Sequence, residues 1–319
     1  MRIAVIGAGG VGGYYGGLLA RQGHEVTFLA RGAHLEAIRR NGLQIKSVHG
    51  DFIVSPAQAT DNLAHIGPVD LILFCVKAYN TERAAQAIKP IIGDHTLILS
   101  LQNGIDAAER IGRVVGLEHL LGGATWISSA IQAPGVINQV SQHRRIVFGP
   151  LNGSITPDHQ SIFEVFQQAG IDVNLSENIT NVLWTKFVFI SAISSLGALT
   201  RLPIGEYRDV PETRLMMRSM MGEVAAVARS QGVDLDADIV EKSQAFIDAF
   251  DPRIKASMQL DVEAGRVFEL ESLVGVISRM GHAANLPTPT ADMVYAALLP
   301  AYLKSWKAAE QARILSLSR

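Results

Sequence analysis

The chain has 319 residues, long enough for two domains at the usual ~100 to 200 residues each. Its residues are 48% hydrophobic and only 18% charged, so we expect large buried cores and exclude an intrinsically disordered protein. The 28 Lys and Arg residues against 30 Asp and Glu give a net charge of -2, which excludes the strongly basic surface typical of nucleic-acid-binding proteins. The single cysteine, Cys75, permits no internal disulfide, and we expect a cytoplasmic protein.

Two apolar stretches resemble membrane or export signals. The first, Met1–Ala20, is interrupted repeatedly by glycines, which a signal peptide does not tolerate in its apolar region. The second, Val182–Leu199, approaches the ~20 residues needed to span a bilayer, but it contains Lys186 and several serines. We therefore expect no membrane partner, and a buried helix over the second stretch.

Short β-branched runs alternate with helical patterns in the first half of the sequence, which is typical of parallel strands joined by crossover helices. Nearly continuous apolar strands indicate a sheet covered by helices on both faces. The fold class is therefore α/β, with an N-terminal doubly wound sheet. The predicted strands are Arg2–Ile6, Glu25–Ala30, Val69–Val76 and Thr96–Leu101, a small hairpin over Gly42–Val54, and two final strands at Gly135–Val140 and Arg145–Phe148.

The pattern changes after Val173–Leu175, because helix periodicity dominates from Glu177 onward. The sequence thus predicts two domains, an α/β domain over residues 1–176 and an all-helical domain over 177–319. Before the last helix, Thr288 is expected to cap a helix with Pro289 at its first position. The predicted helices are Ile179–Leu199, Glu212–Gln231, Ala237–Phe250, Phe268–Ala284 and Ala291–Ala308.

A glycine-rich turn follows the first predicted strand and opens a helix, with the spacing G-x-G-x-x-G. Gly7 would allow the tight turn, Gly9 the close approach of a pyrophosphate, and Gly12 the packing of helix on strand. With Gly10 and Val11, these residues would offer the free N–H groups of a helix N-terminus to an anion. The sequence predicts a dinucleotide site in a Rossmann-type domain; the alternative is a glycine-rich turn in an α/β core.

The end of the second strand indicates which dinucleotide is bound. NAD sites usually place Asp or Glu there to hold the ribose 2′-hydroxyl. This strand ends at Ala30-Arg31, and the planar guanidinium of Arg31 matches a 2′-phosphate. We therefore expect NADP(H), the alternative being an arginine solvated in a loop.

Two further strands end in polar residues at the sheet edge where open α/β folds bind ligands. Lys77 follows Phe74-Cys75-Val76, and Asn103 follows Leu101-Gln102. We expect both side chains to face the nicotinamide ribose or the substrate. For Asn103, a role as N-cap of a helix beginning near Ile105 is equally open.

Acid–base groups have to come from the helical half, because a nucleotide-binding domain does not by itself define a reaction. Lys186 lies in a helix that is otherwise apolar nearly all round, and a buried lysine is costly unless it is paired or functional. Glu269, also flanked by apolar residues, is a candidate partner. The alternatives are a lysine that reaches solvent at the helix edge and a carboxylate that complements a helix dipole. The nine histidines show no metal-ligand arrangement, and we expect no metal site.

In four motifs the chain resembles the ketopantoate reductase (2-dehydropantoate 2-reductase) family, over essentially its whole length. The resemblance implies a Rossmann domain followed by an all-helical domain, with the active site in the cleft between them. The motifs are Gly7-x-Gly9-x-x-Gly12, Leu101-Gln102-Asn103-Gly104, Leu183-Trp184-Thr185-Lys186, and Ala256-Ser257-Met258 followed by Glu269.

The resemblance also implies roles for individual residues. Lys186 matches the catalytic lysine and Glu269 the motif glutamate. Asn103 is expected near nicotinamide and substrate, and Ser257 at the substrate carboxylate. On the cofactor side, Arg31 matches the arginine for the NADP phosphate and Lys77 a cofactor-binding lysine.

The chain departs from the family pattern on the helix of the lysine. Well-known members place asparagines four and eight residues after it, where they contact the pantoate group; this sequence has Ile190 and Ser194. Ile190 offers no side-chain hydrogen bond and Ser194 is shorter. A polyhydroxylated substrate would lose partners worth ~0.5 to 1.5 kcal/mol each.

The resulting hypothesis is NADPH-dependent reduction of a 2-keto acid, most simply 2-dehydropantoate to pantoate in pantothenate biosynthesis. Lys186 would polarise the carbonyl and donate a proton, Glu269 would orient the lysine or bind a substrate hydroxyl, and Ser257 and Asn103 would hold carboxylate and carbonyl. The alternatives are a reductase of the same fold for a bulkier, more apolar 2-hydroxy acid, and a non-catalytic NADP-binding sensor. The helical domain could also provide homodimer contacts.

Overall fold

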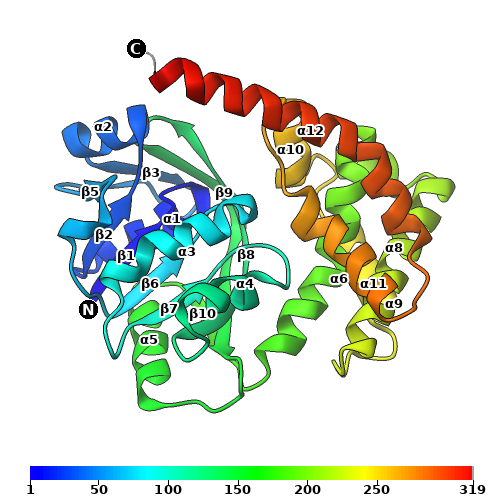
Figure 1. The fold of residues 1–319 in the computed structure, drawn as a ribbon, viewed down its shortest axis with the longest axis horizontal. Helices are drawn as coiled ribbons and strands as arrows, with labels where there is room; N and C mark the ends of the chain where they lie inside the picture. Colours follow the sequence, from blue (N-terminus) through cyan, green and yellow to red (C-terminus); the bar gives the residue numbers. More distant parts are fainter. Residues whose placement is uncertain (318–319) are drawn as a thin grey trace. The chain divides into compact units, whose positions relative to one another are not determined.

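The computed structural model describes residues 1–317, apart from the side chains of His65 and residues 313–317. Contacts between residues divide the chain into two compact units. Unit 1 comprises Met1–Gln102 and Asp106–Val182, and unit 2 comprises Asn103–Ile105 together with the residues from Leu183 onward (Figure 1). The short segment Asn103–Ile105 thus groups with the helical residues, although it follows a strand of unit 1.

Unit 1 contains a mixed sheet with the strand order β4-β3-β9-β8-β7-β6-β1-β2-β5, and β10 pairs with β9. The neighbours β5, β2, β1, β6, β7 and β8 pair in parallel, whereas the β8–β9 and β3–β4 pairs are antiparallel. The strands are β1 Arg2–Ile6, β2 Glu25–Leu29, β3 Leu43–Ser47, β4 Phe52–Val54, β5 Gln58–Thr60, β6 Leu71–Phe74, β7 Leu97–Ser100, β8 Leu120–Ala133, β9 Val136–Pro150 and β10 Asp172–Leu175.

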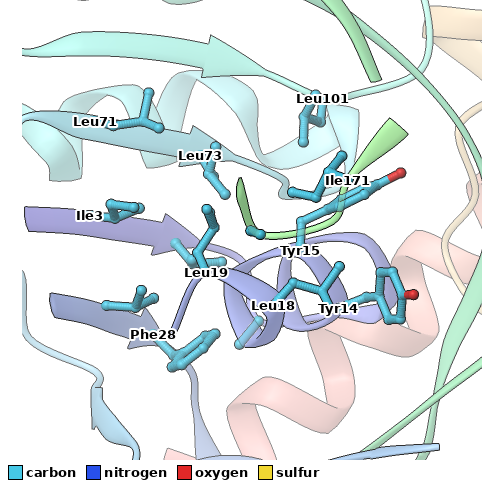
Figure 2. Packing of buried hydrophobic residues seen from close by; sticks show 14 of the residues in the cluster. Ile3, Tyr14, Tyr15, Leu18, Leu19, Phe28, Leu71, Leu73, Leu101 and Ile171 are labelled. Carbon is cyan, nitrogen blue, oxygen red and sulfur yellow. The ribbon is translucent and has the colours of Figure 1, made fainter. Parts of the chain in front are cut away.

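The central strand β1 is buried on both faces, because its successive side chains enter two different hydrophobic clusters. Ile3 and Val5 join the cluster covered by α1 (Gly10–Arg21), α2 (Gly32–Asn41) and α5 (Pro157–Gln168); Figure 2 shows Ile3 near Leu19 of α1. Ala4 and Ile6 join the cluster of α3 (Thr81–Ile88) and α4 (Ala107–Val115). Helices on both faces confirm the predicted doubly wound α/β fold, followed by a helical C-terminal region.

The largest error in the predicted strands concerns the far side of the sheet. Apart from Gly135, which lies in the preceding turn, the segments Gly135–Val140 and Arg145–Phe148 belong to one continuous strand, β9, and its long partner β8 was not predicted. The pairing of β8 with β9 jumps from Ile127↔Arg144 to Ser129↔Gln139, so the expected break is a bulge within β9. Glycines and serines in β8 weaken its intrinsic strand signal, and its pairing partners compensate. The short strands β5 and β10 were also missed, whereas the hairpin β3–β4 is confirmed.

The helices of unit 2 follow the predicted ones closely, with differences at their ends. The helix expected from Phe268 begins at Leu270, and residues Glu271–Gly275 form a π-helical turn (η4) before α11. The last helix extends well beyond Ala308, and the two short helices α7 and α10 were not predicted. The helices are α6 Ile179–Thr200, α7 Ile204–Arg208, α8 Pro211–Ser230, α9 Ile239–Asp248, α10 Ser257–Glu263, α11 Val276–Ala283 and α12 Pro289–Leu317.

The start of α12 is capped differently from the prediction. Helix α12 begins at Pro289 as expected, but the Glu223 carboxylate of α8 accepts the N–H groups of Thr290 and Ala291 at 2.7 and 2.9 Å. The Thr288 hydroxyl instead donates to Asp292 at 3.2 Å. A carboxylate at this position satisfies two N–H groups and complements the helix dipole, which the shorter threonine cannot do as well.

Helix α6 is the one helix within residues 1–317 that is long and apolar enough to cross a membrane. Of its most apolar window, 72% is buried inside the protein. Such burial is expected of a core helix, whose apolar residues contact protein on all sides.

Candidate active site

The glycine turn of unit 1 adopts the conformation that its spacing predicts. Gly7 has φ +105°, and a Cβ at this position would lie 2.9 Å from the backbone nitrogen of Val76, at the end of β6. A Cβ on Gly12 would lie 2.8 Å from Cγ1 of Val5 and would overlap the carbonyl oxygen of Gly7. Both glycines are therefore required by the close packing of turn, helix and strand.

The N-terminus of α1 fits an anionic ligand. Gly9 is the N-cap residue and provides no side-chain cap, and a Cβ on Gly9 would meet nothing within 4 Å. The N–H groups of the first turn, which includes Gly10 and Val11, are then available to an anion in the space beside Gly9. Gly10 has a different constraint, because a Cβ there would overlap the carbonyl oxygen of Ser129 in β8.

Arg31 and Lys77 each follow a central strand of unit 1. Arg31 is exposed and is the N-cap residue of α2, immediately beyond β2. Lys77 is half-buried and precedes the short turn Ala78–Asn80 beyond β6. Both residues therefore lie at the carboxyl edge of the parallel strands, where doubly wound sheets bind ligands.

Gln102 has a structural role that the sequence did not reveal. Its buried Nε2 donates to the carbonyl oxygen of Val76 and to the Thr81 hydroxyl, both at 2.9 Å. These bonds join the end of β7 to the end of β6, and so fix the segments that carry Asn103 and Lys77. The sequence shows an amide side chain directly after an apolar strand, but this pattern does not identify the hydrogen-bond partners of Gln102.

Unit 2 places Lys186 and Asn103 in direct contact. Lys186 of α6 is only 7% exposed, and its Nζ donates to Oδ1 of Asn103 at 2.9 Å. Helix α4 begins at Ala107 with Asp106 as its N-cap residue, so Asn103 does not cap it. Asn103 therefore contacts the buried lysine and does not cap α4, and its role beside nicotinamide and substrate stays a prediction.

Burial determines the acid–base behaviour of Lys186. Loss of solvent lowers its pKa from 10.5 to about 8, and the carboxylate of Glu269 opposes this shift because it favours the ammonium form. Glu269 is itself only 5% exposed. A buried amine with a pKa near neutrality can hold or release a proton under physiological conditions.

The π-helical turn η4 begins two residues after Glu269, at Glu271. The Glu269 carbonyl accepts the N–H of Leu273, within the turn, at 3.1 Å. The turn is clamped by Glu271, whose carboxylate accepts from the Tyr295 hydroxyl at 2.7 Å and from Arg279 at 2.5 Å. Single π-helical turns are frequent at functional sites, because they redirect the side chains beside them.

The remaining candidates lie in helices of unit 2. Ile190 and Ser194 follow Lys186 by four and eight residues on α6, which puts all three on one stripe of the helix. Ile190 is half-buried and Ser194 is 1% exposed. Ser257 is exposed and is the first residue of α10. Among the side chains that the structure describes, no group of three or more His, Cys, Asp or Glu could hold a metal ion.

Comparison with known proteins relates both parts of the chain to one family. Residues 3–153 match the family model of ketopantoate reductase PanE/ApbA, and residues 178–301 match the model of its C-terminal part. The uncharacterized oxidoreductase YkpB of Bacillus subtilis is 31% identical over 298 residues, which cover 93% of this chain and 98% of that protein. A 2-dehydropantoate 2-reductase of Mesorhizobium japonicum is 28% identical over 317 residues, covering 93% of this chain and 96% of the relative.

A solved structure agrees with these sequence relatives. The crystal structure of a PanE/ApbA family ketopantoate reductase from Ralstonia eutropha superimposes with a TM-score of 0.88 at 32% identity, covering 96% of this chain and all of that one. Sequence, fold and the order of the two parts agree along nearly the whole chain. The chain therefore belongs to the ketopantoate reductase PanE/ApbA family of oxidoreductases.

Proposed function

We propose that this protein reduces a 2-keto acid to a 2-hydroxy acid with NADPH, with 2-dehydropantoate as the first substrate to test. The buried Lys186, hydrogen-bonded to Asn103 and with a lowered pKa, is the observation that supports this reaction most. Reduction of a carbonyl requires a proton donor at the oxygen as well as a hydride at the carbon. A lysine that remains an ammonium up to a pH of about 8 supplies that proton.

The proposal gives each candidate residue a distinct role. The ammonium of Lys186 donates a hydrogen bond to the substrate carbonyl and then transfers a proton to the alkoxide oxygen. Asn103 holds Nζ in position through its side-chain carbonyl, 2.9 Å away. Glu269 keeps the lysine protonated despite its burial, because its negative charge offsets part of the desolvation cost. Ser257 contacts the substrate carboxylate.

The cofactor proposal depends on the glycine turn and on Arg31. The uncapped N-terminus of α1 and the open space at Gly9 fit a pyrophosphate, and the guanidinium of Arg31 fits a 2′-phosphate. When bound, reduced NADP supplies the hydride. Lys77 acts on the same nucleotide as a further cation. We expect kcat/KM to be higher for NADPH than for NADH, and Arg31→Ala to reduce that ratio by about tenfold or more.

The choice of 2-keto acid depends on Ile190 and Ser194. The proposal that they face the substrate rests on their position on the Lys186 stripe of α6. Half-buried Ile190 favours an apolar substituent over a hydroxylated one, because an unpaired substrate hydroxyl beside it loses its hydrogen bonds to water. A reductase for a branched or aromatic 2-keto acid is therefore the second candidate function.

One experiment separates these possibilities. NADPH oxidation is followed with 2-dehydropantoate and with branched and aromatic 2-keto acids, and NADPH binding is measured in parallel. Highest kcat/KM for 2-dehydropantoate supports a role in supplying pantoate for pantothenate biosynthesis. Highest kcat/KM for an apolar acid supports the second candidate. Intact NADPH binding with no turnover of any 2-keto acid would refute both and favour a sensor.

A further inference from the structure

His34 joins three segments of unit 1 at the glycine turn. It lies in the first turn of α2, three residues after Arg31. Its Nε2 is 2.8 Å from the carbonyl oxygen of Ala8, in the glycine turn. Its Nδ1 accepts the N–H of Gly135, in the turn between β8 and β9, at 3.0 Å. A single imidazole thus connects the glycine turn, α2 and the β8–β9 turn.

The two partners define the protonation state of this ring. An N–H group can only donate, so Nδ1 must be the unprotonated acceptor for Gly135. A carbonyl oxygen can only accept, so Nε2 must carry the proton that it donates to Ala8. The neutral Nε2–H tautomer satisfies both bonds, and partial burial, which lowers the pKa of His34, favours this neutral form.

The β8–β9 hairpin packs closely against the helices around His34. Gly135 has φ +78°, and a Cβ there would lie 2.9 Å from Cβ of Ala37, so the β8–β9 turn rests directly on α2. A Cβ on Gly13 would lie 2.7 Å from Cγ1 of Ile137, so the start of β9 also rests on α1. The hairpin therefore packs against both helices: the His34 ring bonds its turn to α2, and the Tyr15 hydroxyl of α1 bonds Thr125 of β8 at 2.8 Å.

Ala8 is held at both of its backbone groups. Its N–H donates to the carbonyl oxygen of Leu29, at the end of β2, at 3.2 Å. Its carbonyl accepts from His34, which belongs to the helix that starts after Arg31. These two bonds set the position of the glycine turn relative to the N-terminus of α2, and hence relative to Arg31.

We infer that His34 is a positioning residue that holds Arg31 at the correct distance from the glycine turn, and so contributes to selectivity for a nucleotide with a 2′-phosphate. The inference deepens the proposed function and rests on its choice of NADPH. The pyrophosphate contacts only the N-terminus of α1 in this scheme, whereas the 2′-phosphate also depends on α2. Loss of the link should therefore weaken NADPH more than NADH.

The test uses graded variants of the full chain. His34→Leu removes both hydrogen bonds. His34→Asn keeps an acceptor near Gly135 but is too short to reach Ala8. His34→Gln introduces a planar amide whose NH2 group donates and whose carbonyl oxygen accepts, so it can replace both bonds. His49→Leu is the matched control, because exposed His49 also bonds a carbonyl oxygen, that of Gln142 at 3.0 Å, away from the glycine turn.

Dissociation constants for NADPH and NADH are measured by fluorescence titration, and circular dichroism and thermal melting verify that each variant is folded. His34→Leu and His34→Asn should raise the Kd of NADPH by about tenfold and that of NADH by less than about twofold. His34→Gln should retain most of the NADPH preference, and His49→Leu all of it. If His34→Leu does not fold, His34→Asn provides the same comparison.

Two results in the variants would overturn the inference, and a separate result in the wild-type protein would refute the proposed cofactor. Folded His34 variants with unchanged preference for NADPH, or with equal loss of NADPH and NADH, show that His34 does not position Arg31. A wild-type protein without preference for NADPH refutes the choice of cofactor, and the role of His34 fails with it.

Discussion

Replacement of Lys186 by methionine provides the most direct test of the proposed chemistry. Methionine has similar length and no charge, so Lys186→Met removes the proton donor while it fills the same buried space. A positioned general acid contributes about 100- to 10,000-fold to the rate. We expect kcat to fall by that factor, equivalent to about 3 to 5 kcal/mol of transition-state stabilisation, with NADPH affinity unchanged.

The pKa of about 8 also predicts how the wild-type rate depends on pH. The ammonium is the active form, so kcat/KM should be constant well below pH 8 and should fall tenfold per pH unit above it. Between pH 7 and pH 10 the fall should be about 100-fold. The rate of Lys186→Met should not fall in this way above pH 8, because the variant lacks the titrating amine.

The pH dependence of folding stability gives an independent measure of the lowered pKa of Lys186. The pKa of Lys186 is lower in the folded chain, about 8, than its ordinary value of 10.5, so the unfolded chain binds more protons between these two values. The contribution of Lys186 to stability is therefore largest above pH 10.5 and is lost as the pH falls towards 8. Relative to Lys186→Met, the wild type should lose roughly 3 kcal/mol across this window.

The assays are NADPH oxidation with the best 2-keto acid across pH 6 to 10, and urea unfolding of both proteins over the upper part of that range. NADPH is saturating, the 2-keto acid is kept well below its KM so that kcat/KM is measured, and single-turnover measurements verify that the chemical step limits the rate. Wild-type kcat/KM that rises through pH 8, or a Lys186→Met variant with normal turnover, would refute the assignment of Lys186 as proton donor.

Three further predictions concern other candidate residues. Glu269→Gln should move the alkaline limb of the kcat/KM profile down by about one pH unit, because the charge of Glu269 raises the pKa of Lys186; an unmoved limb would show that Glu269 does not act on the lysine. Gly10→Ala should lower the free energy of unfolding by about 1 to 3 kcal/mol in urea titrations, because the added Cβ overlaps the carbonyl oxygen of Ser129. Gly9→Ala should leave the free energy of unfolding unchanged and weaken NADPH binding, because its Cβ meets nothing within 4 Å. The reverse pattern would contradict the geometry of the turn. Ile190→Asn should raise kcat/KM for 2-dehydropantoate relative to an apolar 2-keto acid, and an unchanged ratio in the substrate panel would place Ile190 away from the substrate.

Much of the fold is encoded in local sequence. The β1 strand, the glycine turn and the start of α1 follow from residues adjacent in the chain, and the structure reproduces them within one or two residues. The predicted β3–β4 hairpin and most helices of unit 2 follow in the same way. Burial of Lys186 was also predictable, because the residues around it in α6 are apolar on nearly every side.

Features that depend on distant residues were not predictable. Strand β8 contains too many glycines and serines to be recognised alone, and it is stabilised by its long pairing with β9. The π-helical turn after Glu269 depends on Tyr295 and Arg279, which meet Glu271 only in the folded chain. The Glu223 cap of α12 likewise comes from another helix.

Within the candidate site, the sequence by itself determined the residue types and their order: a glycine turn, an arginine after β2, and a lysine in an apolar helix. Tertiary structure decided their partners. Asn103 and Lys186 are 83 residues apart and share a hydrogen bond, and Gly135 donates to His34 across 101 residues. Helix and strand preferences arise among near neighbours in the chain, whereas these contacts and the pKa of Lys186 arise from burial and packing after the chain has folded.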